Sequence, residues 1–163
     1  MIEPITPIDI PRILLQQVYE IARQEYPNEC CGWLAGDRGG SVASVVRSCV
    51  NTQATGGHPT KSDRTAETAY VMTGADLLAL DQSLDSDRPA LVIYHSHPNG
   101  QAYFSSTDRE VARDPFGGNG PAYPVQQLVI GVLSERVVEA ALFAWSETDN
   151  DFVEIDRYDG DTQ

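Results

Sequence analysis

Basic residues are scarce in this sequence: 11 lysines and arginines stand against 24 aspartates and glutamates, giving a net charge of −13. This charge disfavours nonspecific binding to nucleic-acid phosphates or to anionic membranes. The chain also lacks an apolar run near the roughly 18 residues that span a bilayer. Its first residues, MIEPITPIDIPR, contain no basic segment followed by an apolar one, so they do not resemble a signal peptide. We therefore expect a cytoplasmic protein with no nucleic-acid partner and no membrane partner.

Cysteine is also sparse. The three cysteines, Cys30, Cys31 and Cys49, are odd in number and two of them are adjacent, which argues against a secreted disulfide scaffold. The length of 163 residues fits one domain, and 41% hydrophobic residues supply a core without disulfides or a structural metal. A metal in this protein would therefore serve chemistry rather than folding.

Negative charge gathers at the C-terminal end. The segment SETDNDFVEIDRYDGDTQ holds seven acidic residues and a single base, Arg157. We divide the chain into a folded domain over residues 1–146 and an acidic C-terminal segment over residues 147–163. That segment is either a solvated tail or an edge strand.

Apolar spacing predicts helices and strands in alternation. A first helix, with Asp9 as its N-cap, runs to about residue 24. Thr73 caps a second helix, whose Leu77, Leu78, Leu80 and Leu84 are expected to face inward, and a short third helix follows Ser105. Strands are expected at residues 31–36, 41–49, 69–72, 90–94, 128–133, 137–145 and 152–155. Two Gly-rich loops, 51–69 and 114–124, carry no motif that we can interpret. This order predicts an α/β (α+β) fold around one sheet.

The segment YHSHPNGQAYFSSTD carries the clearest chemical signal. His95 and His97 follow a buried strand, and side chains two residues apart in a strand point to the same face. A pair of imidazoles at that spacing is a natural start for a zinc site, for which a catalytic centre needs a third protein ligand. The third histidine, His58, lies in a polar loop and is expected at the surface.

Asp108 is the candidate for the third ligand, and two interpretations compete. Ser105-Ser106-Thr107-Asp108 has the form of a capping box, in which Asp108 bonds back to the backbone at the helix start. Alternatively, Asp108 projects from the first turn onto the metal. Glu29, at the edge of the first buried strand, is the candidate for proton transfer, because a glutamate is unusual beside so apolar a run.

These residues resemble a known family. HSHPNGQAYFSSTD fits the JAMM (MPN+) signature, His-x-His, seven residues, then Ser-x-x-Asp, and NECCGWLAG resembles the upstream glutamate motif. The chain is thus similar, over about residues 14–143, to the Mov34/MPN/PAD-1 (JAB1/MPN) metalloproteases, the prokaryotic branch in particular. The resemblance implies a single MPN-like domain with a mixed, cytidine-deaminase-like sheet flanked by helices.

The resemblance also implies the site and its reaction. His95, His97 and Asp108 would bind one Zn²⁺ with a bound water, Glu29 would act as general base and then acid, and Ser105 would donate to the oxyanion. Ser96 would point away from the metal. The implied activity is that of a zinc-dependent isopeptidase or peptidase, cutting after the C-terminal glycine of a ubiquitin-like or sulfur-carrier protein with a Gly-Gly tail, in deconjugation or in precursor processing.

Three alternatives stay open. The first is a non-catalytic MPN scaffold for protein assembly. The second is a thiol hydrolase, with Cys30 or Cys31 as nucleophile and a histidine as base. The third is a RadC-like protein, which fits the acidic charge poorly. The oligomeric state and the individual substrate are not predicted.

Overall fold

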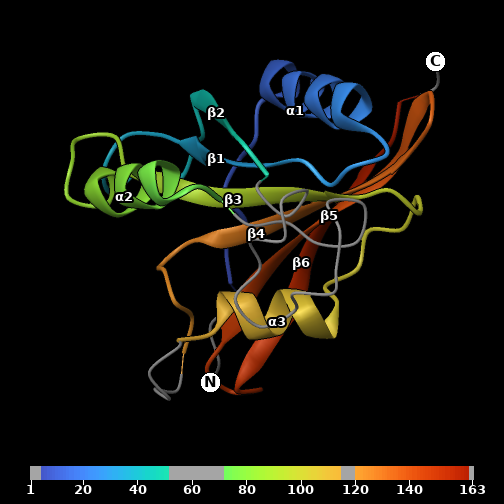
Figure 1. Ribbon diagram of the computed structural model, residues 1–163. Coiled ribbons are helices and arrows are strands. Elements are labelled where there is room, and N and C mark those ends of the chain that lie inside the picture. The colour runs from blue at the N-terminus through green and yellow to red at the C-terminus, as the bar shows by residue number, and fades with distance from the viewer. Residues whose placement is uncertain (1–4, 52–71, 115–119, 162–163) are drawn as a thin grey trace.

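A computed structural model describes residues 5–51, 72–114 and 120–161, and shows one mixed six-stranded sheet with helices on both faces (Figure 1). The predicted α/β (α+β) class is confirmed. His58 and almost all of the 51–69 loop lie outside the described residues, as do 115–119 of the second loop. Of the strand predicted at 69–72 only Met72 is described, where it forms a single bridge with Asn51. The strands are β1 (Cys31–Ala35), β2 (Val45–Cys49), β3 (Ala90–His97), β4 (Gln126–Leu133), β5 (Arg136–Ser146) and β6 (Asp151–Asp159), and the helices are α1 (Arg12–Glu25), α2 (Gly74–Ser83) and α3 (Ser106–Ala112).

The strands lie in the order β2-β1-β3-β4-β5-β6. Every neighbouring pair is antiparallel except β3 and β4, which are parallel. Parallel neighbours require a long crossover, and here the crossover carries α3. The connection from β3 to β4 therefore crosses one face of the sheet, next to the end of β3.

Helix α1 covers one face of the sheet. Its Leu14, Val18 and Ala22 recur at helical spacing and pack with Leu34, Val92, Leu128, Ile130 and Leu142 of the strands in one buried cluster. The cap prediction for this helix is wrong: Pro11 occupies the N-cap position and makes no side-chain cap bond. Asp9 pairs with the chain instead, since its N–H donates to the Ser41 carbonyl (2.8 Å) and its carbonyl accepts from the Ala43 N–H (2.9 Å).

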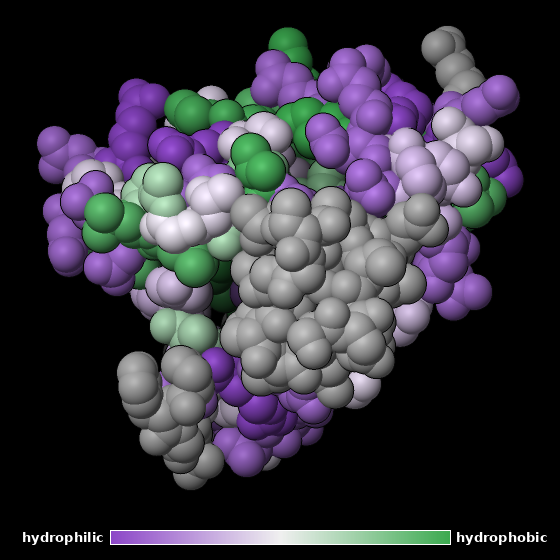
Figure 2. Space-filling model, in the orientation of Figure 1, coloured by the Kyte–Doolittle hydropathy of each residue, from purple (hydrophilic) through white to green (hydrophobic). Residues whose placement is uncertain are grey.

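Helix α2 lies on the opposite face, over β1 and β3. Its predicted cap is confirmed, because the Thr73 hydroxyl accepts from the Asp76 N–H at 3.0 Å. The inward-facing leucines are only half right: Leu80 is buried, whereas Leu77 and Leu78 are 41% and 58% exposed. Apolar residues occur on several sides of this helix, so their spacing alone does not show which side packs against the sheet. Figure 2 shows apolar side chains gathering over α2 and near α1 and β2 on an otherwise largely hydrophilic face.

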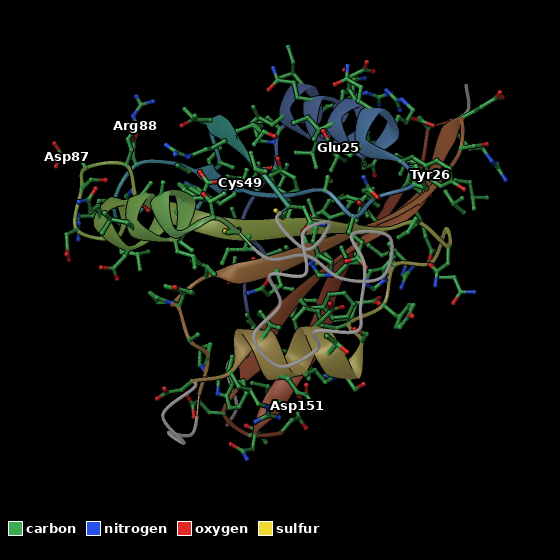
Figure 3. All side chains as sticks on the ribbon, in the orientation of Figure 1. Glu25, Tyr26, Cys49, Asp87, Arg88 and Asp151 are labelled. Atoms are coloured by element: carbon green, nitrogen blue, oxygen red, sulfur yellow. The ribbon has the colours of Figure 1, made fainter. Side chains whose placement is uncertain are left out.

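Helix α3 packs on the same face as α2, but over β4, β5 and β6. Phe104 is the centre of a small aromatic cluster beneath α3, with its ring centroid 5.3 Å from that of Phe143 and 4.9 Å from that of Phe152. Arg109 of α3 and Arg113, the C-cap of α3, pair with Asp151 of β6 at 2.7 and 3.2 Å. Figure 3 shows Asp151 beside the helix. These contacts hold α3 against the β6 edge of the sheet.

The acidic segment forms β6, an edge strand longer than the predicted 152–155. Its pairing with β5 runs from Glu139 opposite Asp159 to Ser146 opposite Asp151. Of the two alternatives for this segment, the strand is the one observed, while the domain boundary near residue 146 stays a prediction. None of the helices in the described ranges is long and apolar enough to cross a membrane.

Candidate metal centre

Strand β3 carries both histidines. The strand continues through His97, three residues beyond the predicted end, and both rings are buried, His95 at 0% and His97 at 6% exposure. Their Nε2 atoms lie 3.2 Å apart. The predicted alternation therefore brings the two imidazoles together on the face that α2 and α3 cover.

Asp108 forms the capping box and also points its carboxylate at the two histidines. The capping box is complete: the Ser105 Oγ accepts from the Asp108 N–H (3.1 Å) and the Asp108 Oδ2 accepts from the Ser105 N–H (2.9 Å). The same carboxylate meets the histidines, with Oδ1 3.1 Å from His95 Nε2 and Oδ2 3.0 Å from His97 Nε2. A carboxylate has enough lone pairs for both, so the cap orients Asp108 toward the imidazoles.

The donor atoms fit a small tetrahedral metal. Zinc with nitrogen ligands at about 2.0–2.1 Å keeps tetrahedral ligand atoms about 3.3 Å apart. The Nε2 and Oδ atoms of His95, His97 and Asp108 lie 3.0–3.2 Å apart, close to that spacing. Two imidazoles and a carboxylate are ligand types that zinc prefers, and three protein ligands leave one position open.

The Nδ1 atom of His97 lies 3.1 Å from the Gln101 carbonyl oxygen. A carbonyl only accepts, so Nδ1 carries a proton, and Nε2 faces Asp108 and His95. The Tyr103 ring packs on His97 with centroids 4.8 Å apart. The outer contacts of His97 thus suit a metal ligand.

Glu29 reaches the same place from the segment just before β1. It is buried at 5% exposure, and its carboxylate lies within 4.8 Å of the ligand nitrogens of His95 and His97. Two hydrogen bonds hold the backbone at this point: Asn51 Nδ2 donates to the Glu29 carbonyl (2.9 Å), and the Cys30 N–H donates to Ser96 Oγ (2.8 Å). Sequence reasoning missed Asn51, because one more polar residue at the start of a polar loop gives no signal.

The electrostatics favour an ionised Asp108. Burial raises the pKa of this carboxyl, but the adjacent rings of His95 and His97 outweigh burial and hold the pKa well below its usual range. The group is therefore a carboxylate at neutral pH. That is the form that binds a divalent cation.

The thiols have the opposite character. Burial raises the pKa of Cys30 to about 12 and that of Cys49 to about 11, and it raises the pKa of Cys31 further still. A thiolate is the nucleophilic form, and the raised pKa values disfavour it at neutral pH. Cys30 also packs in the α1 cluster, on the face away from the histidines. The thiol-hydrolase alternative has no support from this arrangement.

Comparison with known proteins agrees with the geometry. Residues 11–151 match the family described as prokaryotic homologs of the JAB domain. The chain belongs to this JAB-domain family. The predicted resemblance to JAMM proteins of the prokaryotic branch is thereby confirmed.

Relatives of the JAB-domain chain include proteins named CysO-cysteine peptidase from Mycobacterium tuberculosis and Mycobacterium bovis, 30% identical over 95 residues. The match covers 58% of this chain and 58% of the relatives' length. Among solved structures, a Desulfitobacterium hafniense protein aligns with a TM-score of 0.60 at 22% identity, covering 90% of this chain and 88% of that one. A Salinibacter ruber protein aligns with a TM-score of 0.57 at 20% identity, covering 95% and 93%. These structures share the fold.

Proposed function

We propose that this JAB-domain protein is a zinc-dependent peptidase, with one Zn²⁺ held by His95, His97 and Asp108. The convergence of those three donor groups at 3.0–3.2 Å, with a buried glutamate beside them, carries the proposal. Zinc bound there would polarise a scissile carbonyl and lower the pKa of a neighbouring water toward about 7.

Glu29 is the proposed general base. Its buried carboxylate lies beside the histidines, within reach of a water in the open position. It would take the proton from the water as the water oxygen attacks the carbonyl carbon. It would then give that proton to the leaving amine as the C–N bond breaks. The first transfer leaves Glu29 protonated, and the second returns it to the carboxylate.

Ser105 is the proposed oxyanion donor. Its Oγ accepts the Asp108 N–H through a lone pair, so the hydroxyl proton stays available. A hydroxyl aimed at the developing negative charge contributes about 3 kcal/mol to lowering the barrier. The capping box fixes the hydroxyl next to Asp108, where the carbonyl oxygen of a substrate would lie.

The proposed substrate is a small ubiquitin-like or sulfur-carrier protein, cut after its C-terminal glycine. The relatives named CysO-cysteine peptidase support a bond that joins cysteine to a protein partner. An extended Gly-Gly tail is narrow enough to approach a metal centre set among buried side chains. The non-catalytic scaffold is the alternative, and it has no need of four converging donor groups.

Metal content is the first test. We expect about one zinc per chain in purified protein and a large loss in Asp108→Ala. The second step is mass spectrometry of a ubiquitin-like protein that ends in Gly-Gly followed by cysteine, incubated with the enzyme or with Glu29→Gln. Release of cysteine by the wild type alone supports the peptidase. Failure of the protein to take up supplied zinc would overturn it in favour of the scaffold.

A further inference from the structure

The chain between His97 and Asp108 folds back over β4. Gly131 of β4 lies opposite His97 in the parallel pairing, and a Cβ at Gly131 would come within 2.5 Å of the Gly100 carbonyl group. The absence of a side chain at Gly131 therefore lets this loop lie directly on the sheet. The same register continues outward to Glu139 of β5.

Two charged side chains from the outer strands meet this loop at Ala102, which is 1% exposed. The Glu139 Oε2 accepts from the Ala102 N–H at 2.9 Å, and Arg157 Nη2 donates to the Ala102 carbonyl at 3.2 Å. Glu139 and Arg157 pair with each other at 2.8 Å. The Ala102 N–H and the Arg157 guanidinium both lower the pKa of Glu139, which is ionised at neutral pH.

The bond from Glu139 and the bond from His97 fall on one peptide unit. The N–H of Ala102 and the carbonyl of Gln101 belong to the same planar amide, and in a trans peptide they point in opposite directions. Glu139 accepts from one side of this amide, and the His97 Nδ1–H donates to the other. A negative charge on the N–H side polarises the amide and strengthens its carbonyl as an acceptor.

We propose that Glu139, held by Arg157, is a positioning residue for His97, acting through the Gln101–Ala102 peptide. The inference rests on the proposed metal site. In many metal centres a carboxylate accepts directly from the ligand histidine and makes it a better donor. Here one rigid amide stands between them. The arrangement also gives a purpose to Arg157, the single base in the acidic C-terminal segment.

The test compares zinc affinity among variants by competition with a chromophoric chelator. Loss of an outer partner of a ligand histidine weakens metal binding by about 10- to 100-fold, so Glu139→Ala is expected to bind zinc about tenfold more weakly. Glu139→Gln keeps an oxygen that accepts from Ala102 but loses the charge, and is expected to fall between. Glu154→Gln is the matched control, since Glu154 also pairs with Arg157 at 2.7 Å, whereas the side-chain hydrogen bonds at Ala102 come from Glu139 and Arg157.

Two further readouts separate positioning from a merely structural role. Melting of the metal-free variants reports structural damage, which lowers the melting temperature without selectively weakening zinc binding. NMR of the His97 ring in metal-free protein reports the Nδ1–H bond, whose proton signal is expected to move upfield in Glu139→Ala. If Glu139→Ala does not fold, Glu139→Gln provides both measurements.

The outcomes are distinct. Zinc binding within twofold of the wild type in both Glu139 variants would overturn the inference and leave the proposed function standing. If the wild type binds no zinc, the proposed function fails, and the inference is decided by the His97 proton signal alone. An unchanged signal in that case overturns it as well.

Discussion

On the α1 face of the sheet, buried apolar side chains form one continuous cluster, whereas the face under α2 and α3 carries two smaller clusters. His95 lies between those two. Its strand neighbours are Cys31, in the α2 cluster, and Val129, in the α3 cluster. The gap between the clusters is filled by Glu29, His95, His97 and Asp108, all buried.

Burial of polar groups in such a gap has a cost unless each group has partners. The α1 face buries mainly apolar side chains and supplies stability. The opposite face accepts that cost where β3, α3 and the segment before β1 bring His95, His97, Asp108 and Glu29 together. Such a local break in apolar packing is expected at a functional site, where the residues are selected for chemistry rather than for packing. The two faces should therefore respond differently to substitution.

The largest expected effect is on activity alone. Glu29→Gln removes the proposed base but keeps the shape of the side chain, so kcat for a Gly-Gly-tailed substrate is expected to fall by about 10²- to 10⁴-fold. Zinc content and urea unfolding are expected to match the wild type. Full activity in this variant would mean that another group moves the proton.

The converse effect is expected on the α1 face. Leu128 is fully buried in the continuous cluster, so Leu128→Ala leaves a cavity and should lower the free energy of unfolding by about 2–5 kcal/mol. Urea titration measures the change. Zinc stoichiometry of the folded fraction is expected to stay at the wild-type value, and a selective loss of zinc would show that the faces are coupled.

Ser96 joins the two faces, since it follows His95 on β3 and bonds to the backbone beside Glu29. Ser96→Ala leaves the buried Cys30 N–H without its acceptor, at a cost of about 1–3 kcal/mol in stability. The lost bond also fixes the backbone next to Glu29. Because the proposed base is then less well positioned, kcat is expected to fall by a larger factor than KM changes. Steady-state kinetics and unfolding curves of the same preparation check both statements, and Ser96→Thr, which retains a hydroxyl, serves as the control.

Alkaline pH should destabilise the protein through the buried thiol of the α1 face. The pKa of Cys30 is raised to about 12 in the folded chain, above the value of about 8.5 for a free thiol. Its stabilising contribution is therefore intact below about pH 8.5 and is lost as the pH rises toward 12, by about 1 kcal/mol per pH unit. Unfolding free energies measured from pH 8 to 11 should fall less steeply in Cys30→Ala.

The smallest expected effect is that of thiol alkylation, which should leave peptidase activity unchanged. Iodoacetamide should leave Cys30 and Cys31 unmodified in the folded protein at pH 7.5, and peptidase activity should persist, because both thiols are buried and protonated. A metal chelator should abolish the same activity. Peptide mapping gives the modified positions, and inactivation that tracks labelling of either cysteine would revive the thiol mechanism.

Much of this architecture follows from local patterns. Val129, Ile130 and their neighbours form an apolar run that predicts β4, and the spacing of Leu14 and Val18 predicts α1. The exposed Leu77 and Leu78 were mispredicted because an apolar residue on a helix reports no direction by itself. Asp9 was mispredicted because a pairing with Ser41 and Ala43, distant in the sequence, replaced a local cap.

The sequence by itself determined the α/β class, the pairing of His95 and His97 on one face, and the capping box that aims Asp108, because strand alternation and helix capping act over a few residues. Only the tertiary structure decided that Glu29 meets the histidines, that Asn51 bonds the Glu29 carbonyl, and that Glu139 and Arg157 reach the Ala102 peptide. Those contacts join residues 22 to 68 positions apart. They depend on strand order and register, which no local pattern specifies.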